Sequence, residues 1–250
     1  MSKATMNRSG RYIYAIVSGK ISSRNLPKGI KGQSLSAVTV GAVTALVSDV
    51  ANKKIRPERR NLAAHQNVLK ELVSAGTVLP MRFGVIADGD RAVEKLLREH
   101  GERFARQLVH LEGKVEMGLR VSLDVPNIFE FFVNNHTELR SERDRFIKGN
   151  QEPSHEDKIA LGRLFDRILT ETREILTMRI EEALAPHLVE VLRNAYRSER
   201  EIMNLACLVE RKALQEFESA LFEAANLFDN NYTFDYNGPW APHNFVEMEF

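Results

Sequence analysis

The chain has 250 residues, of which 43% are hydrophobic and 28% are charged. This composition is typical of a folded globular protein, and it excludes extensive disorder as well as collagen-like and low-complexity classes. The single cysteine excludes an intramolecular disulfide and a cysteine-rich zinc site. The first residues contain no apolar stretch typical of a secretory signal, and the uncharged stretch 32–48 is too short to span a membrane, so we expect a cytoplasmic protein without a membrane partner.

The net charge of +1 hides a strong asymmetry between the two halves of the chain. Residues 1–110 contain 19 Lys and Arg against 8 Asp and Glu, a net charge of +11, whereas residues 111–250 contain 16 against 26, a net charge of −10. Such opposite fields allow the halves to attract each other, or neighbouring copies to stack head to tail. The balanced total argues against a dedicated polyanion-binding protein.

The first part of the chain predicts the order β-β-β-α-β-α. The elements expected in residues 1–111 are a strand at 12–17, a hairpin at 35–40 and 43–50, a helix after Pro57 that ends at Gly76, a strand at 77–83, and a helix capped by Asp90 that runs to Leu111.

The second part predicts a ferredoxin-like order. The elements expected in residues 112–237 are a strictly alternating strand at 115–123, a helical stretch at 128–146, a long helix at 157–184, strands at 187–193 and 202–209, a helix from Leu214 to Phe228, and a strand at 232–236. This is the split βαβ pattern. We therefore predict an α+β fold with two α+β domains, at 1–111 and 112–237, the second being ferredoxin-like. A tail at 238–250 is expected to pack on the body through Trp240 and Phe245.

No motif indicates catalysis. The sequence lacks a phosphate loop, GxGxxG, HExxH and GxSxG, and the seven histidines have no metal-ligand spacing on a helix turn. We therefore predict no catalytic, metal-binding or cofactor-binding residue and no enzyme activity. His65 lies on an apolar helix face and is expected to be a buried neutral imidazole with one hydrogen bond. Residues 155–157 are expected to cap the long helix that follows.

A basic segment at 53–60 contains Lys53, Lys54, Arg56, Arg59 and Arg60. Such a segment can bind phosphate, nucleic acid or an acidic protein surface, or it can be a solvated loop that faces the acidic second domain. Sequence-specific RNA binding also needs exposed aromatic residues on sheet strands, and PMRFG at 80–84 does not fit the RNP pattern. Nucleic acid is therefore not the expected partner.

Several segments together resemble the gas vesicle protein F/L family (GvpF/GvpL). They are RYIYAIV at 11–17, TALVSDV at 44–50, RPERRNLAAHQNVLKELV at 56–73, TVLPMRFGVIAD at 77–88, KVEMGLRV at 114–121, and NGPWAPHNFV at 237–246. The family tail usually reads GPWPPYNFV, so Ala241 and His243 depart from it. The resemblance implies an α+β N-terminal domain, a ferredoxin-like C-terminal domain and a C-terminal tail.

The resemblance also implies a function that is not enzymatic. We expect an accessory or minor structural protein of gas vesicles that binds the major gas vesicle shell protein (GvpA) and assists vesicle nucleation and assembly, with other accessory proteins as further candidate partners and no cofactor. The competing class is a cytosolic regulatory module that binds a ligand or nucleic acid through the basic segment, since ferredoxin-like folds host many unrelated roles.

The N-terminal domain is the expected site of shell-protein binding. Its uncharged, β-rich hairpin can offer a strand edge, and the basic segment beside it can orient the partner. The alternative is that the hairpin is a buried central part of the sheet. The candidate interface residues are Val38, Val40, Val43, Lys53, Lys54 and Arg56.

Overall fold

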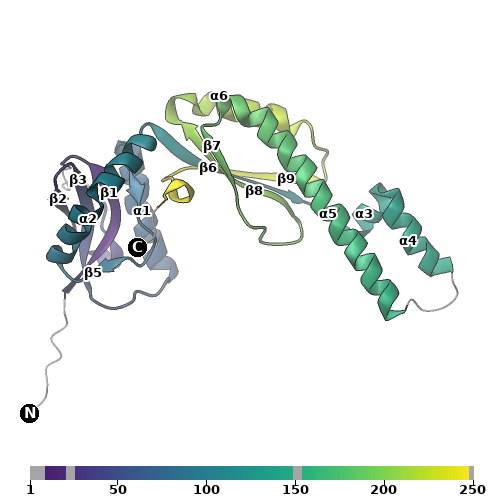
Figure 1. Ribbon diagram of the computed structural model, residues 1–250, viewed down its shortest axis with the longest axis horizontal. Helices are drawn as coiled ribbons and strands as arrows, with labels where there is room; N and C mark the ends of the chain where they lie inside the picture. Colours follow the sequence, from purple (N-terminus) through teal and green to yellow (C-terminus); the bar gives the residue numbers. More distant parts are fainter. Residues whose placement is uncertain (1–8, 21–25, 149–153, 248–250) are drawn as a thin grey trace, which may run out of the picture. The chain divides into compact units, whose positions relative to one another are not determined.

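The structure is a computed structural model that describes residues 9–20, 26–148 and 154–247 (Figure 1). The chain forms two compact units. The first contains Met1–Met117, Leu208–Lys212 and Gly238–Phe250, and the second contains Gly118–Cys207 and Ala213–Asn237.

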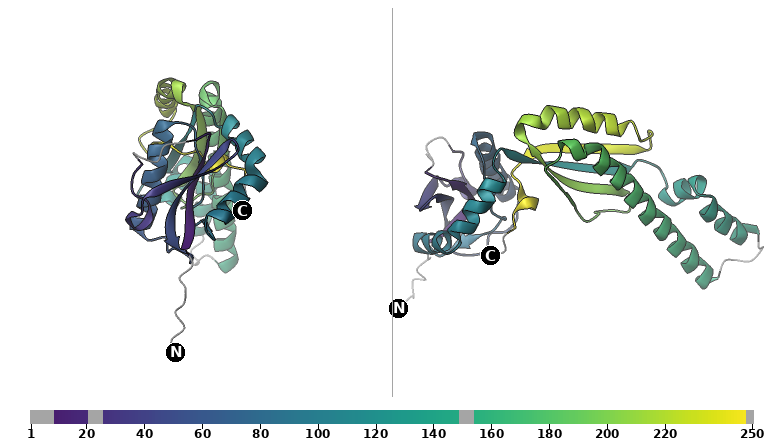
Figure 2. Two further views of the ribbon diagram at one scale, coloured as in Figure 1. Left: turned by 90° about the vertical axis from the view of Figure 1, so that its left-hand side faces the viewer. Right: turned by 45° about the horizontal axis from the view of Figure 1, so that its top comes forward.

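The first unit is a sheet with one helix on each face (Figure 2). Its elements are β1 (Ser9–Ser18), the short 3-10 helix η1 (Ile30–Gly32), β2 (Leu35–Val40), β3 (Val43–Ala51), α1 (Arg59–Ala75), β4 (Leu79–Pro80), β5 (Ile86–Ala87), α2 (Asp90–His110) and the tail turn η4 (His243–Phe245). The strand order is β2-β3-β1-β4, with β5 also paired to β1, and all pairs are antiparallel. The central strands β1 and β3 are almost entirely buried, and α1 and α2 contribute further buried side chains to the core.

The buried side chain of Tyr14 holds the loop before β2 against the sheet. Tyr14 Oη accepts a hydrogen bond from the backbone N–H of Ile30 (2.8 Å) and lies 2.9 Å from Ser48 Oγ. A Cβ atom at Gly29 would lie 2.2 Å from Tyr14 Oη, so only glycine allows the loop before β2 to approach so closely. The phenol thereby anchors this loop to the core, because a buried hydroxyl must be hydrogen-bonded.

The second unit contains a four-stranded sheet with α5 and α6 on the same face (Figure 1). Its elements, including three strands (β6, β8 and β9) that continue into the first unit, are β6 (Lys114–Leu123), α3 (Ile128–Asn135), α4 (Thr137–Lys148), α5 (His155–Leu184), η2 (Ala185–His187), β7 (Glu190–Arg193), β8 (Glu201–Glu210), η3 (Arg211–Ala213), α6 (Leu214–Ala225) and β9 (Tyr232–Trp240). The order β7-β8-β6-β9, with α5 and α6 as the connecting helices, is the split βαβ order. The helices α3 and α4 are inserted between β6 and α5.

The α+β class predicted from the sequence is confirmed, and so is the alternating strand at 115–123. The long helix begins at His155, where Ser154 and Asp157 form a reciprocal capping box. The predicted strand at 77–83 is shorter than expected, because only Leu79 and Pro80 pair with β1 before the chain turns at Gly84, whose φ is +97°.

The predicted cap at Asp90 is wrong. Gly89 is the N-cap residue of α2 and Asp90 is the first residue of the helix, so the Asp90 side chain does not cap it. Its carboxylate instead lies 2.6 Å from Nε of Arg11, which also pairs with Asp49 on β3. Asp90 therefore links the start of α2 to the sheet.

The compact units differ from the expected ranges 1–111, 112–237 and 238–250. Residues 112–117, 208–212 and the described part of the tail, 238–247, belong to the first unit. Gly238 begins this return with φ +139°, and a Cβ atom there would lie 2.7 Å from Met117 Sδ. The first unit is thus assembled from three separate stretches of the chain.

Candidate protein-interaction surface

The strand β2 is at the edge of the first sheet. Among the described residues it pairs only with β3, and the two strands are joined by the two-residue turn Gly41–Ala42. The residues that flank such a turn form a hydrogen-bonded pair, and hydrogen-bonded and non-hydrogen-bonded pairs then alternate along the ladder. The backbone groups of Ala37 and Thr39 therefore point away from β3, toward the open edge. Both residues are exposed and neither is charged.

The three valines of the hairpin that were predicted as interface residues are buried or half-buried. Val43 is 2% exposed and faces α2, so it offers no accessible surface, which corrects its inclusion among the interface residues. Val38 and Val40 share its face through the register of the hairpin and are half-buried. The accessible part of the edge is the backbone and the small side chains of Ala37 and Thr39.

The basic segment lines a cavity of about 450 Å³. Lys53, Lys54 and Arg56 are all exposed on its wall, as the sequence suggested, and Ile55 between them is 8% exposed and ties the segment to the core. The cavity is completed by the following residues: Lys31, Val50, Ala51, Glu58, Arg60 and Asn61. Lys31 comes from the turn before β2, so the cavity lies beside the start of the edge strand.

The charges around this basic cavity are poorly balanced. Arg60 pairs with Glu58 at 2.9 Å. Lys31, Lys53, Lys54 and Arg56 form no ion pair with any residue that the structure describes. The field around the cavity is therefore positive and suited to an anionic group.

The C-terminal tail is anchored in the first unit by Phe245, which is 3% exposed. Trp240, the other expected anchor, is 41% exposed, so it contributes much less burial than predicted. Next to Phe245, the backbone N–H and the side-chain Nδ2 of Asn244 donate to the Glu116 carboxylate at 2.9 and 2.6 Å. Glu116 alternates with the apolar residues of β6, but this contact leaves it 7% exposed. Burial raises its pKa, and the hydrogen bonds from Asn244 oppose that rise.

A buried aromatic cluster joins the tail to α1. His65 Nδ1 lies 3.0 Å from Tyr12 Oη, and the rings of His65 and His243 have centroids 6.5 Å apart. Burial lowers the pKa of His65 to about 4, with a smaller contribution from His243, and burial also lowers the pKa of His243. The prediction of a buried neutral imidazole at position 65 is therefore confirmed. Nε2 of each ring has no hydrogen-bond partner among the described atoms.

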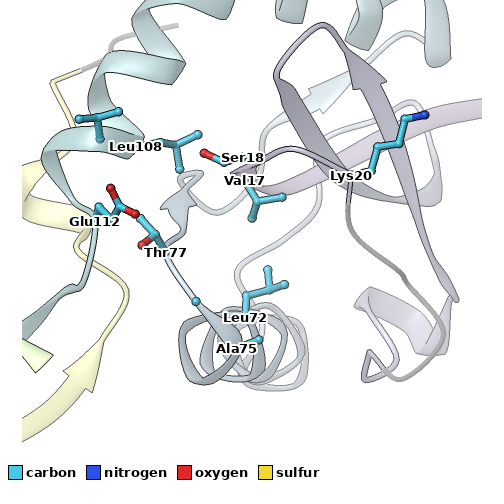
Figure 3. A pocket seen from close by; sticks show the side chains of 10 residues that line it. Val17, Ser18, Lys20, Leu72, Ala75, Thr77, Leu108 and Glu112 are labelled. Atoms are coloured by element: carbon cyan, nitrogen blue, oxygen red, sulfur yellow. The ribbon is translucent and has the colours of Figure 1, made fainter. Parts of the chain in front are cut away.

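A second cavity, of about 330 Å³, lies at the opposite end of the first sheet (Figure 3). It is formed where β1, α1 and α2 end. Figure 3 shows Glu112 beside Thr77, whereas the ammonium group of Lys20 points away from the other labelled residues. Its mixed lining presents no convergent set of polar groups, so it is a weaker ligand site than the basic cavity.

Neither cavity resembles a catalytic or metal centre. Within residues 9–20, 26–148 and 154–247, no group of three or more His, Cys, Asp or Glu side chains could hold a metal ion. None of the helices in those ranges combines the length and the apolar character that a membrane-spanning segment requires. The first unit instead combines an open strand edge with a basic cavity, a combination suited to binding a protein chain.

Comparison with known proteins gives the family. The family described as "Gas vesicle synthesis protein GvpL/GvpF" matches residues 10–247. A gas vesicle protein F from Streptomyces sp. is 34% identical over 94% of this chain and 99% of its own length, and one from Nostoc sp. is 26% identical over 96% and 99%. The chain therefore belongs to the gas vesicle protein GvpL/GvpF family.

The solved structures agree. The crystal structure of GvpF from Anabaena sp. superposes with a TM-score of 0.84 at 25% identity, over 97% of this chain and all of that chain. GvpF from Microcystis aeruginosa has the same fold, with a TM-score of 0.80 at 23% identity over 96% and 99% of the two chains. The family consists of accessory and structural proteins of gas vesicles, so this chain has a gas vesicle-associated role.

Three features of the first unit were not found from the sequence. Lys31 joins the basic cavity from a separate loop, and His243 and the Asn244–Glu116 contact depend on the return of the tail. Nothing in the sequence around Lys31 or Glu116 indicated these contacts. The family tail motif, from which His243 departs, was the one available signal for the tail cluster.

Proposed function

We propose that this chain binds the major gas vesicle shell protein and assists nucleation and assembly of the vesicle shell. The observation that carries the proposal is the open β2 edge in a member of a gas vesicle family. A protein that lines a gas-filled shell has to present apolar surface, and such a surface aggregates in water until it is paired or covered. An accessory protein can hold such a subunit before assembly.

Strand addition is the binding mode that the edge supports. A partner strand that pairs with β2 gains main-chain hydrogen bonds through the outward groups of Ala37 and Thr39. Uncharged edges of this kind are normally blunted by charged residues, proline or bulges, because they attract other strands. None of these devices occurs between Leu35 and Val40, so the edge is left available.

The test is retention of the major shell protein by the full chain after co-expression. Ala37→Pro removes an outward-facing backbone N–H and leaves the inner ladder to β3 in place. We expect this variant to retain at least about tenfold less shell protein than the wild type. Ala37→Ser, which keeps the N–H, is the matched control and should retain as much as the wild type.

Equal melting curves for the two variants would show that the fold is intact. Retention by Ala37→Pro at the wild-type level would overturn the edge as the binding site. Failure of the wild-type chain to retain any shell protein would overturn the proposed partner.

A further inference from the structure

The basic cavity brings together side chains that the sequence keeps apart. Lys31 lies on the turn before β2, Lys53 and Lys54 follow β3, and Arg56 precedes α1. These four cations surround about 450 Å³ without an ionic partner among the described residues. Holding four like charges around one cavity is unfavourable, and an anion that enters the cavity relieves the repulsion.

The N-terminus of α1 adds to the excess of positive charge around the cavity. The helix α1 begins with Arg59 and Arg60 and has no acidic residue in its first turn, and Glu58 at its N-cap makes no side-chain capping hydrogen bond. Cations at a helix N-terminus oppose the helix dipole, whereas an anion there is stabilised. The basic cavity and the N-terminus of α1 therefore both favour an anionic ligand.

The size and lining of the cavity indicate a carboxylate. The side chains that form it include no aromatic ring on which a base could stack, so single-stranded nucleic acid gains only phosphate contacts there. A volume of 450 Å³ accommodates one or two acidic side chains rather than a polynucleotide backbone. Guanidinium and ammonium groups bind carboxylates through short, charge-assisted hydrogen bonds.

The position of the cavity relates this ligand to the edge strand. Lys31 lies four residues before Leu35, the first residue of β2. At about 3.3 Å per residue, a strand that pairs with β2 can place a residue from its own end near the cavity. An acidic side chain there would fix the register of a strand that is otherwise free to slip.

We propose that the basic cavity is a carboxylate-binding site that receives an acidic side chain of a protein partner, located just beyond the residue opposite Leu35. The identity of this partner rests on the proposed function, whereas the carboxylate chemistry does not. The bound strand is thus held at two points, by main-chain pairing along β2 and by the charge contact at its end.

The test uses the full-length chain labelled with nitrogen-15 and a tetraglutamate peptide as the probe. We expect saturable shifts of the backbone amide signals of Ile55 and Asn61, which line the cavity. In the triple variant Lys53→Gln, Lys54→Gln, Arg56→Gln the apparent affinity should fall by about tenfold or more. The matched control is Lys70→Gln, Arg98→Gln, Arg106→Gln, which removes three exposed cations from α1 and α2 and should bind as the wild type does.

Three results of this titration would overturn the proposal. The first is an equal loss of affinity in the control variant, which would mean that net charge alone attracts the peptide. The second is stronger binding at the same amides by an oligothymidylate of equal charge, which would assign the cavity to nucleic acid. The third is stronger binding by inorganic phosphate, which would assign it to a free anion.

Retention of the shell protein separates this proposal from the proposed function. If the wild-type chain binds tetraglutamate at Ile55 and Asn61 but retains no shell protein, the carboxylate site stands and the proposed function fails. If the triple cavity variant retains as much shell protein as the wild type while Ala37→Pro does not, the edge stands as the binding site and the proposed contact between the cavity and the partner is overturned.

Discussion

The two units have the same strand order, but their corresponding edge strands differ in length and charge. In the first unit the order β2-β3-β1-β4 matches the order β7-β8-β6-β9 of the second, when each strand is counted along its own unit. Between β1 and β2 the described residues of the first unit contain the short 3-10 helix η1 and no longer helix, whereas α5 occupies the corresponding place in the second unit. The two units are therefore variants of one topology.

The corresponding edge strands, β2 and β7, show the difference. The strand β2 has six residues without a charge, whereas β7 has four residues that begin with Glu190 and end with Arg193. Arg193 forms ion pairs with Glu174 (2.8 Å) and Glu181 (2.5 Å) on α5, which tie β7 to the helix above it. Short, charged edges resist the addition of another strand.

This contrast is the physical reason for proposing the binding surface in the first unit. A connecting helix supplies charged side chains that can protect the neighbouring edge, as α5 does for β7. The loop that replaces it in the first unit supplies Lys31 and Lys28 but no acid, so β2 stays open and its surroundings stay positive. The same topology thus produces one protected edge and one available edge.

The largest expected effect concerns the tail that completes the first unit. Phe245→Ala removes a side chain that is 3% exposed, and we expect a loss of about 3–5 kcal/mol in the free energy of unfolding. Trp240→Ala, at a side chain that is 41% exposed, should cost less than half as much. Urea unfolding of both variants measures the difference. Equal losses would mean that the tail is not held through Phe245.

The next effect is a pH dependence that originates in the first unit alone. The ordinary pKa of histidine is 6.5, and well above that pH the imidazole of His65 is neutral in both the folded and the unfolded chain, so it does not affect stability there. Below that pH the unfolded chain takes up a proton while the buried ring, whose pKa is about 4, does not, and stability falls. Between pH 6.5 and 4.5 this amounts to about 2 kcal/mol.

Comparison with His65→Asn isolates this contribution from the carboxylates that titrate in the same range. Glu116 acts in the opposite direction, because its raised pKa makes the folded chain take up a proton more readily as the pH falls. The decrease in unfolding free energy from pH 6.5 to 4.5 should be about 2 kcal/mol larger in the wild type than in His65→Asn. Parallel pH profiles would show that His65 is protonated in the folded chain.

The smallest effect on stability is expected at the protected edge. Arg193→Gln breaks two exposed ion pairs and should cost about 1 kcal/mol or less. It also removes a charge at the edge strand β7 that disfavours the addition of another strand. The variant should therefore self-associate at lower protein concentration than the wild type, as measured by sedimentation velocity. Arg179→Gln, at another exposed arginine of α5, is the control and should leave the sedimentation profile unchanged.

Sequence patterns predicted individual strands and helices. They did not predict contacts between residues that are far apart in the sequence. The alternation at 115–123 and the apolar face of the helix after Pro57 identified their elements, because each strand or helix carries its own period. The burial of Glu116 depends on Asn244, which is 128 residues away, and no local period reports such a contact.

Only part of the candidate surface was predicted from the sequence. The charges of Lys53, Lys54 and Arg56 marked the basic segment, but its cavity also needs Lys31, which only the fold brings near. The valines of the hairpin indicated a strand correctly. Which of its faces α2 covers depends on the register and on helix packing, so the buried Val43 could not be separated from the open Ala37 beforehand.

Hydrogen exchange of the full chain, with and without the major shell protein, tests most directly whether the open edge is the binding surface. The outward amides of Ala37 and Thr39 should exchange freely in the isolated chain and become protected in the complex. The amides of β7, from Glu190 to Arg193, should exchange at the same rate in both states. Protection confined to β7, with no change along β2, would contradict the account.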